Sequence, residues 1–440
     1  MIADLKPYPA HKNSGVPWLG EMPAGWEVRR NGRLFAERKE TGFPDLPILE
    51  VSLRTGVRVR DFSLSERKQV MDERGKYKRA ARGDIAYNMM RMWQGAVGVA
   101  PTDGLVSPAY VVARPLPGTV SRYFAYLYRT SAYMGEVNNY SHGIVADRNR
   151  LYWDEFKQIP TPYPPPEEQS AIVHFLNWVN GRLERAIQTK KKELGLVREA
   201  LLTVTQQALR LQGTRSLRLA AAAEVVLRPI DRLASCNYTP IGVYNRGRGI
   251  FHKEKRNGAE LGDSEFFWVE HGDLVISGQF AWEGAVALAR YNDSGCVASH
   301  RYPILRGRKE YVSSAVLMAL FRTSYGSMLL DHHSRGAAGR NRPLNVGTLL
   351  KEKVPIPPLS AQAHITELLD QEQTLALSTT QLTRFINEYR DRLITDLVTG
   401  KLDVREATAH LPEKFEEPGP LDEADALDYE GSELMDDVEE

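Results

Sequence analysis

The sequence contains two related copies about 190 residues apart, and this internal repeat limits the possible folds more than any other feature. The segment Trp93–Val97 recurs as Trp282–Val286 at an offset of 189 residues, and Gly83-Asp84 recurs at positions 272–273 with the same offset. Solenoid repeats have much shorter periods, roughly 20 to 50 residues. Each copy must therefore contain a whole domain and the segment attached to it.

A polar loop with a Ser-x-Gly pattern is part of the repeat. Ser141–Gly143, followed by Arg148–Arg150, matches Ser334–Gly336, followed by Arg340–Arg342. Chance matches would not keep one fixed order along the chain. The copies therefore arose by duplication, and small changes of offset are what loop insertions produce.

A proline cluster closes each copy and leads into a long amphipathic segment. Pro162–Gln169 matches Pro355–Gln362 at an offset of 193. Because proline cannot donate to a β-ladder and restricts the residue before it, we expect each domain to end here. Apolar residues then recur mostly every three or four positions over 172–211 and 365–397, the pattern of a coiled-coil seam. A helix of about 45 residues is roughly 65 Å long.

These patterns predict an α+β fold with two globular, mixed α/β domains separated by two long antiparallel coiled-coil helices, related by a pseudo-twofold internal repeat. The alternative is two unrelated amphipathic helices, each packed on its own domain. The expected boundaries are a first domain at 1–165, a central helix at 166–213, a second domain at 214–357, a distal helix at 358–402 and an acidic, disordered tail at 403–440.

Charge is distributed unevenly along the chain. Residues 402–440 contain 15 acidic and 2 basic side chains, a net charge of −13, so the rest of the chain carries +14 within an overall +1. The stretch 29–91 alone has 16 basic and 9 acidic residues. A positive body of this kind is typical of proteins that bind polyanions. A solubilising tail on a mildly basic protein is the alternative explanation.

The composition excludes several classes of protein. Hydrophobic residues make up 42% and charged residues 26% of 440 residues, as in folded proteins of mixed composition. No run reaches the roughly 18 apolar residues that a membrane span needs. Two cysteines, Cys236 and Cys296, cannot form a four-thiolate zinc site. We therefore expect a reducing, cytoplasmic setting and no membrane partner.

Catalytic motifs are missing from the sequence. There is no Walker phosphate loop and no Gly-x-Ser-x-Gly nucleophile motif. Asp45 and Glu50-Val51-Ser52 imitate a nuclease carboxylate motif, but serine stands where lysine is required. His332-His333 are expected to be surface histidines near a helix end, not metal ligands. The sequence indicates a protein that binds and does not catalyse.

The chain resembles the specificity subunit (HsdS) of type I restriction–modification enzymes in three segments. Ser14–Trp26 is similar to the entry into the family's first target-recognition domain, Pro164–Gln169 to the start of its central spacer helix, and Leu393–Leu402 to the end of its distal helix. The resemblance spans about residues 14–404. Two features depart from the family pattern: the second proline step, ending at Gln362, lacks the acidic pair, and the acidic tail is additional.

The resemblance implies a DNA-binding subunit without catalytic activity of its own. Each target-recognition domain would read one half of an asymmetric, bipartite site in double-stranded DNA. The implied partners are two copies of an adenine methyltransferase (M) subunit, which use S-adenosylmethionine, and a restriction (R) motor subunit, which uses ATP and Mg²⁺. This chain itself would hold no cofactor and no metal.

Three other functions stay open at this point. The chain could read DNA for a different anti-phage methyltransferase system, or act as a structural adaptor that never touches DNA. It could also be an enzyme of unknown motif, such as a divergent nuclease.

Candidate DNA contacts come from the repeated turn and loop and from the basic stretch. Bases are best distinguished by Arg, by Asn or Gln, and by carboxylates, and the repeated turn varies between Gln94 and Glu283. Trp93 and Trp282 are expected in the core or as platforms. The predicted DNA-binding residues are Arg58, Arg60, Lys76, Lys78, Arg91, Gln94, Ser141, His142, Arg148, Asn149, Arg150, Arg246, Arg248, Gln279, Glu283, Ser334, Arg335, Arg340, Asn341 and Arg342.

Overall fold

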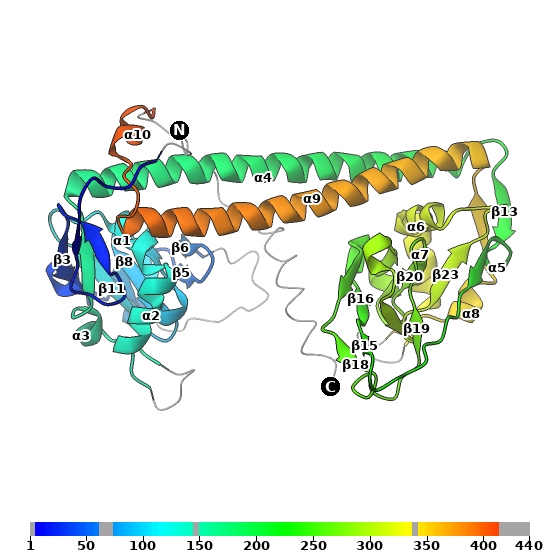
Figure 1. Ribbon diagram of the computed structural model, residues 1–440, viewed down its shortest axis with the longest axis horizontal. Coiled ribbons are helices and arrows are strands. Elements are labelled where there is room, and N and C mark those ends of the chain that lie inside the picture. Colours follow the sequence, from blue (N-terminus) through cyan, green and yellow to red (C-terminus); the bar gives the residue numbers. More distant parts are fainter. Residues whose placement is uncertain (1–4, 61–73, 144–148, 337–341, 413–440) are drawn as a thin grey trace. The chain divides into compact units, whose positions relative to one another are not determined.

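The computed structural model describes residues 5–60, 74–143, 149–336 and 342–412. The chain divides into two compact units (Figure 1). Unit 1 comprises 1–187 and 382–440, and unit 2 comprises 188–381. Each unit combines a mixed α/β domain with parts of both long helices, so that neither helix belongs to one domain alone.

The domain of unit 1 is built around a four-stranded antiparallel sheet with the order β4-β11-β8-β9. Its strands are β4 (Phe35–Glu37), β11 (Tyr110–Pro115), β8 (Ile85–Asn88) and β9 (Val97–Val99). Two-stranded pairs are formed by β1 (His11–Asn13) with β2 (Glu21–Pro23), β3 (Glu27–Arg30) with β12 (Pro160–Tyr163), β5 (Leu49–Ser52) with β6 (Gly56–Val59), and β7 (Lys78–Ala80) with β10 (Gly104–Val106). The helical segments are η2 (Asn31–Arg33), η3 (Arg74–Lys76), η4 (Met92–Gln94), α1 (Ser121–Tyr128), α2 (Ser131–Tyr140) and α3 (Trp153–Phe156).

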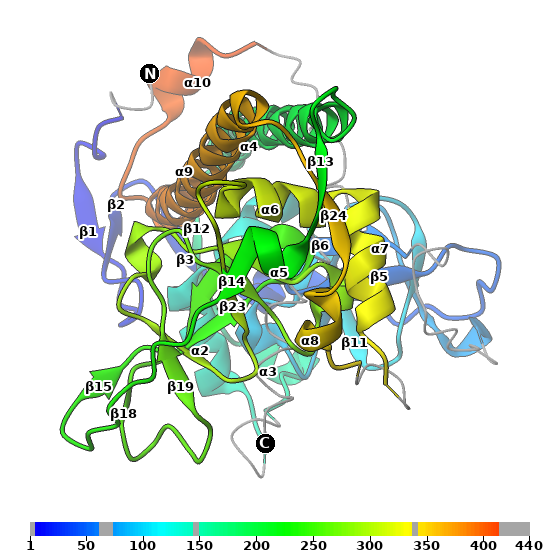
Figure 2. The ribbon, with the colours of Figure 1, turned by 90° about the vertical axis from the view of Figure 1, so that its right-hand side faces the viewer.

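The domain of unit 2 has the matching sheet, in the order β14-β23-β20-β21. Its strands are β14 (Ala223–Val225), β23 (Ile304–Gly307), β20 (Leu274–Ile276) and β21 (Val286–Leu288). The pairs are β13 (Arg215–Arg218) with β24 (Lys353–Ile356), β15 (Asn237–Tyr238) with β18 (Arg256–Asn257), β16 (Ile241–Val243) with β17 (Ile250–His252), and β19 (Phe266–Trp268) with β22 (Val297–Ser299) (Figure 2). The helical segments are α5 (Leu219–Ala222), η6 (Asn245–Gly247), η7 (Ala281–Glu283), η8 (Tyr291–Asp293), α6 (Ser314–Arg322), α7 (Ser324–His333) and α8 (Val346–Leu349).

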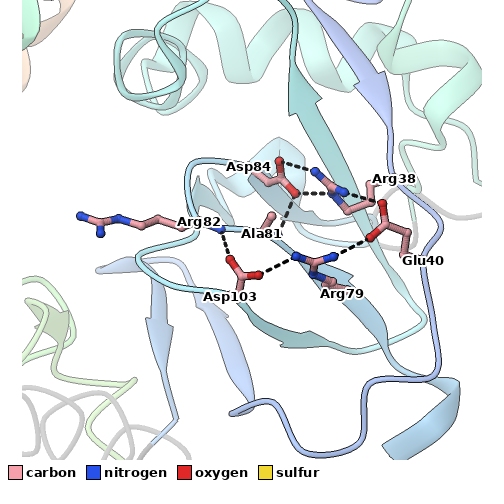
Figure 3. Close-up of polar contacts among 7 residues, drawn as sticks. All are labelled: Arg38, Glu40, Arg79, Ala81, Arg82, Asp84 and Asp103. Carbon is pink, nitrogen blue, oxygen red and sulfur yellow. Dashed lines mark hydrogen bonds and ion pairs between the residues drawn. The ribbon is translucent and has the colours of Figure 1, made fainter.

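One buried ion pair recurs at the same place in both sheets, just before β8 and β20. Asp84 accepts a hydrogen bond from Arg38 at 2.6 Å (Figure 3), and Asp273 accepts one from Arg228 at 2.8 Å. In each case the backbone N–H three residues earlier also donates to the carboxylate, at 2.8 Å. Each carboxylate therefore connects the turn before the strand with an arginine of the same domain by charge-assisted hydrogen bonds. This contact explains why the Gly-Asp pair recurs in the sequence. The predicted fold class and internal repeat are confirmed.

The two long helices are α4 (Pro166–Ala208) and α9 (Leu359–Val398), with 43 and 40 residues. They run antiparallel within each unit. In unit 1 the first part of α4 packs on the last part of α9, where Arg390 lies 3.4 Å from Glu184. In unit 2 the last part of α4 packs on the first part of α9, where Arg198 lies 2.8 Å from Glu372. No described helix is both long enough and apolar enough to cross a membrane.

Residues 403–412 are folded, so the predicted disorder was wrong for this part of the tail. Asp403 donates its backbone N–H to the carbonyl of Lys6 at 2.8 Å, helix α10 (Arg405–Ala409) follows, and Leu411 is buried. Counting charges missed this because a few buried contacts with the N-terminal segment outweigh a polar composition. Residues 413–440 lie outside the described part of the chain.

Candidate nucleic-acid interface

Unit 1 brings the repeated tryptophan turn and the Ser-x-Gly loop together. Helix η4 ends at Gly95, whose φ of 88° only glycine adopts without strain. His142 and Arg150 form an antiparallel bridge with two backbone hydrogen bonds of 3.0 Å. The next residue, Leu151, donates to the carbonyl of Met89 at 2.9 Å, just before the turn. One hydrogen-bonded frame therefore holds both motifs.

Unit 2 brings its turn and its loop together in a similar way. Helix η7 ends at Gly284 with φ 74°, and Ser334 forms an antiparallel bridge with Leu344. Leu344 donates to the carbonyl of Gly278 at 2.7 Å, which is the counterpart of the contact in unit 1. We call the two regions turn–loop site 1 (residues 89–95, 141–143 and 149–151) and turn–loop site 2 (278–284, 334–336 and 342–344).

Turn–loop site 1 presents polar side chains to solvent. Arg91, Gln94, His142 and Arg150 are exposed. Asn149 is half-buried and donates its amide to the side-chain oxygen of Asn138 at 2.9 Å. Together with the buried Ser141, six of the predicted DNA-binding residues are thus brought together in turn–loop site 1.

Turn–loop site 2 places an arginine on a tryptophan. The guanidinium carbon of Arg342 lies 4.9 Å from the centre of the Trp282 ring, within the range of a cation–π contact. Arg342 also forms an ion pair with Asp331 at 2.8 Å and donates from Nε to the carbonyl of Ser334 at 3.2 Å. Trp282 is therefore a platform, as predicted.

Helix η6 lies beside turn–loop site 2 and contributes further predicted residues. Gly247 donates its backbone N–H to Gly284 at 2.9 Å, and Asn245 donates to the carboxylate of Glu283. Arg246 is exposed and has a φ of 57°, the single positive φ among described non-glycine residues. Arg248 lies 5.2 Å from the centre of the Tyr244 ring. Backbone strain of this kind is frequent at functional sites.

The structure shifts one sequence match by one residue. The loops correspond at an offset of 193, because the bridges His142–Arg150 and Ser334–Leu344 share one register and Leu151 and Leu344 make the equivalent hydrogen bond. This makes Asn149 the counterpart of Arg342, and Asn138 the counterpart of Asp331. The sequence comparison had aligned Asn149 with Asn341, because it matched two Arg-Asn-Arg triplets. Arg148, Arg340 and Asn341 lie outside the described residues.

Much of the basic stretch in unit 1 is engaged with the domain itself. The side chain of Arg58 pairs with Glu50, and that of Arg60 lies 4.0 Å from the same carboxylate. Lys78 donates to the carbonyl of Tyr110 at 2.7 Å, and burial lowers its pKa. Lys76 is exposed.

Arg79 is also engaged with its own domain, because its guanidinium forms ion pairs with Glu40 at 3.0 Å and with Asp103 at 2.7 Å (Figure 3). The side chain of Arg82 points away from these residues. Because a paired cation attracts phosphate less than a free one, the local +7 overstates the charge that this surface offers to a polyanion.

Several predicted residues lie inward. Ser334 is fully buried, and Ser141 is nearly so and donates to the carbonyl of Val137 at 2.7 Å. Gln279 is half-buried on the turn of site 2, whereas Arg335 is exposed and donates to the carbonyl of His332. The two serines therefore shape the loops, and we leave them out of the proposed DNA surface.

Sequence reasoning missed the partners that hold these side chains, namely Asn138, Asp331 and Asn245. The offset of 193 could have revealed that Asn138 and Asp331 correspond. The expectation of surface histidines was wrong for His333, which is buried and bonds to Thr348 at 2.8 Å. Within the described residues, no three or more His, Cys, Asp or Glu side chains are grouped to hold a metal ion.

Comparison with known proteins identifies the fold. No family model and no curated protein matches the sequence. A chain from a structure on complex assembly and conformational transition of the type I restriction–modification system aligns over 87% of this chain and 99% of its own, with 15% identity and a TM-score of 0.55. This chain has the fold of that chain of a type I restriction–modification system.

Two further solved structures align less closely. The HsdS subunit from Thermoanaerobacter tengcongensis aligns over 87% of this chain and 98% of its own, with 16% identity and a TM-score of 0.44. The S subunit of a type I system from M. genitalium aligns over 84% and 96%, with 13% identity and a TM-score of 0.47.

Proposed function

We propose that this chain is the DNA-recognition subunit of a type I restriction–modification complex. One observation carries the proposal: in both domains an equivalent leucine, Leu151 or Leu344, hydrogen-bonds the loop to the tryptophan turn, but the two sites present different polar side chains. Site 1 offers Arg91, Gln94 and Asn149, whereas site 2 offers Glu283 and Arg342. Arg, Gln, Asn and Glu are the side chains that distinguish base edges in the major groove.

The two domains would then read two different half-sites, and the recognised DNA sequence would be bipartite and asymmetric. The basic stretch and Arg150 would contact phosphates, which position a protein on DNA without reading its sequence. In this proposal two methyltransferase subunits bind S-adenosylmethionine and modify adenine, and a restriction subunit uses ATP and Mg²⁺. This chain would supply recognition and assembly only.

The test is a base-resolution map of DNA methylation in a host that carries this chain together with its methyltransferase. The expected result is a split motif with one methylated adenine in each half. A stable complex that adds no methylation would contradict the proposal and favour a structural adaptor. DNA binding whose strength does not change with salt concentration would also contradict the proposal, because phosphate contacts release counterions and therefore weaken as salt increases.

A further inference from the structure

Resting on the proposed function, we propose that Arg342 is a specificity-determining residue that reads a guanine in the half-site of the second domain. Its side chain is 31% exposed, so it is neither a core residue nor a freely solvated one.

Three contacts fix the plane of the Arg342 guanidinium. Its carbon Cζ lies over the ring of Trp282, Nε donates to the carbonyl of Ser334, and Nη2 pairs with Asp331. Ser334 is fully buried and Trp282 half-buried, so two of these anchors belong to the body of the domain. An arginine fixed in this way loses little conformational freedom when it binds a base.

The contacts with protein involve Nε and Nη2 of the guanidinium, and no described contact involves Nη1. Nη1 and Nη2 each carry an N–H bond at the end of the planar fork, and these two bonds are parallel. Two parallel N–H groups match O6 and N7 of guanine, which are both acceptors in the major groove. Adenine has an acceptor at N7 but a donor at the neighbouring N6, so it cannot accept two hydrogen bonds from the guanidinium.

Phosphate binding would make poorer use of this arrangement. The carboxylate of Asp331 already neutralises the charge of Arg342 at 2.8 Å, which weakens its attraction for a phosphate group. The geometry of the planar fork is unaffected by that pairing. An arginine with its charge compensated and its plane fixed is therefore better suited to reading a base than to binding the backbone.

The equivalent position in unit 1 supports the assignment. Asn149 takes the place of Arg342, and its partner Asn138 takes the place of Asp331, with an amide–amide hydrogen bond of 2.9 Å instead of an ion pair. Both members of the pair differ between the copies, whereas the register of the loop is the same. This is expected if each domain orients a different reading group at one fixed position.

The test compares base preferences of the whole complex on a library in which each position of both half-sites is randomised. Arg342→Ala should lower the preference for guanine at one position of one half-site by roughly 5- to 150-fold, the range for a bidentate arginine contact. Arg342→Lys keeps the charge but loses the fork, so it should relax the same position. Asp331→Asn should give a smaller loss there, because the guanidinium is held less firmly.

Two controls separate reading from general binding. Arg308→Ala removes an exposed arginine of unit 2 that lies outside turn–loop site 2, and it should leave the base preferences unchanged. Asn149→Ala, in the other domain, should leave the half-site that Arg342 reads unchanged.

The assignment is overturned if Arg342→Ala and Arg342→Lys weaken binding equally for all sequences, or if the position they affect is not a guanine. In either case the split site of the unaltered complex still stands, and with it the proposed function. If the unaltered complex recognises no split site, the proposed function itself fails.

Discussion

Two equivalent arginines, Arg129 in unit 1 and Arg322 in unit 2, make different contacts. Arg129 in unit 1 is half-buried, and partial desolvation lowers its pKa; it donates to the carbonyls of Leu53 and Arg54 at 2.5 and 2.7 Å. Arg322 in unit 2 pairs with Glu372 on α9 at 2.9 Å. The first arginine therefore braces a β-hairpin of its own domain, whereas the second joins its domain to a long helix.

The helix side of this contact has changed accordingly. Glu372 is buried on α9 between Arg322 and Arg198 of α4, whereas its counterpart on α4, at an offset of 193, is the fully buried Val179. Unit 1 instead joins domain and helix through the hydroxyl of Tyr123, which donates to the carbonyl of Val398 at 2.9 Å. A duplicated fold can thus keep its backbone while it exchanges an ionic attachment for an aromatic one.

The N-terminal segment explains another difference between the copies. Glu168 is buried at the start of α4 and accepts hydrogen bonds from the hydroxyl of Tyr8 and, at 2.8 Å, from the indole of Trp26. The equivalent position in the second copy is Ala361. The second proline step has no acidic residue at this position because Glu168 binds an N-terminal segment that precedes the first copy.

Removing the ionic attachment should have the largest effect. Glu372→Ala leaves Arg322, whose side chain is 11% exposed, without its partner, and loss of one partner of a buried ion pair typically costs about 3–5 kcal/mol. Hydrogen exchange of the full chain, followed by mass spectrometry, should show this loss in peptides of unit 2 and little change in unit 1. Glu367→Ala, at an exposed site of the same helix, is the matched control. Equal loosening of both units would contradict the comparison.

Acid should weaken the same attachment less severely, because a protonated carboxyl can still form hydrogen bonds. Burial alone would raise the pKa of Glu372, but the charges and hydrogen bonds of Arg322 and Arg198 outweigh it and hold the pKa below its ordinary value of 4.5. A lowered pKa contributes stability that is complete above the unfolded value and is lost as the pH falls through the folded value.

Exchange in unit 2 should therefore accelerate as the pH falls below about 4.5, after correction for the intrinsic pH dependence of exchange. Glu372→Gln should lack this component. An identical pH response in the variant and the unaltered chain would refute the role of the ion pair.

The N-terminal attachment should come next in size. Glu168→Ala removes the acceptor of two buried donors, the Tyr8 hydroxyl and the Trp26 indole. Because neither donor is charged, no buried charge is left unpaired, and the loss should be on the order of 1–3 kcal/mol, less than for Glu372→Ala. Exchange should accelerate in the segments around Tyr8 and Trp26, with no change in unit 2. Glu167→Ala, at the exposed neighbouring residue, should have almost no effect. Glu168→Gln, which keeps an acceptor oxygen, should fall between the two.

The sequence was sufficient for the features that repeat along the chain. The Gly-Asp and tryptophan matches correctly predicted two related domains, and the apolar period predicted both long helices. The polar seam residue Glu372 escaped this reasoning, because its partner Arg322 is 50 positions away and only the fold brings them together.

The candidate site was less predictable. Residue types indicated Gln94, Glu283 and Arg342, but burial of Ser141 and Ser334 depends on how the loop closes. The one-residue shift between Asn149 and Arg342 arose because similar letters were aligned, whereas the structure aligns backbone hydrogen bonds.

The smallest expected loss of stability comes from replacing the threonine N-caps of α2 and α7, and it should be equal in the two units. Thr130 and Thr323 begin α2 and α7, and each donates its hydroxyl to a carbonyl three residues earlier at 2.7 Å while accepting from a backbone N–H three residues later. Both are almost fully buried. Loss of an N-cap hydroxyl costs about 1 kcal/mol, so Thr130→Ala and Thr323→Ala should each destabilise their own unit by that amount in the exchange experiment. The serine variants should retain most of the stability. If the two alanine variants lost amounts of unfolding free energy that differ by more than about 1 kcal/mol, the energy of this shared cap would depend on its neighbours. The two copies would then be equivalent in backbone geometry but not in energy.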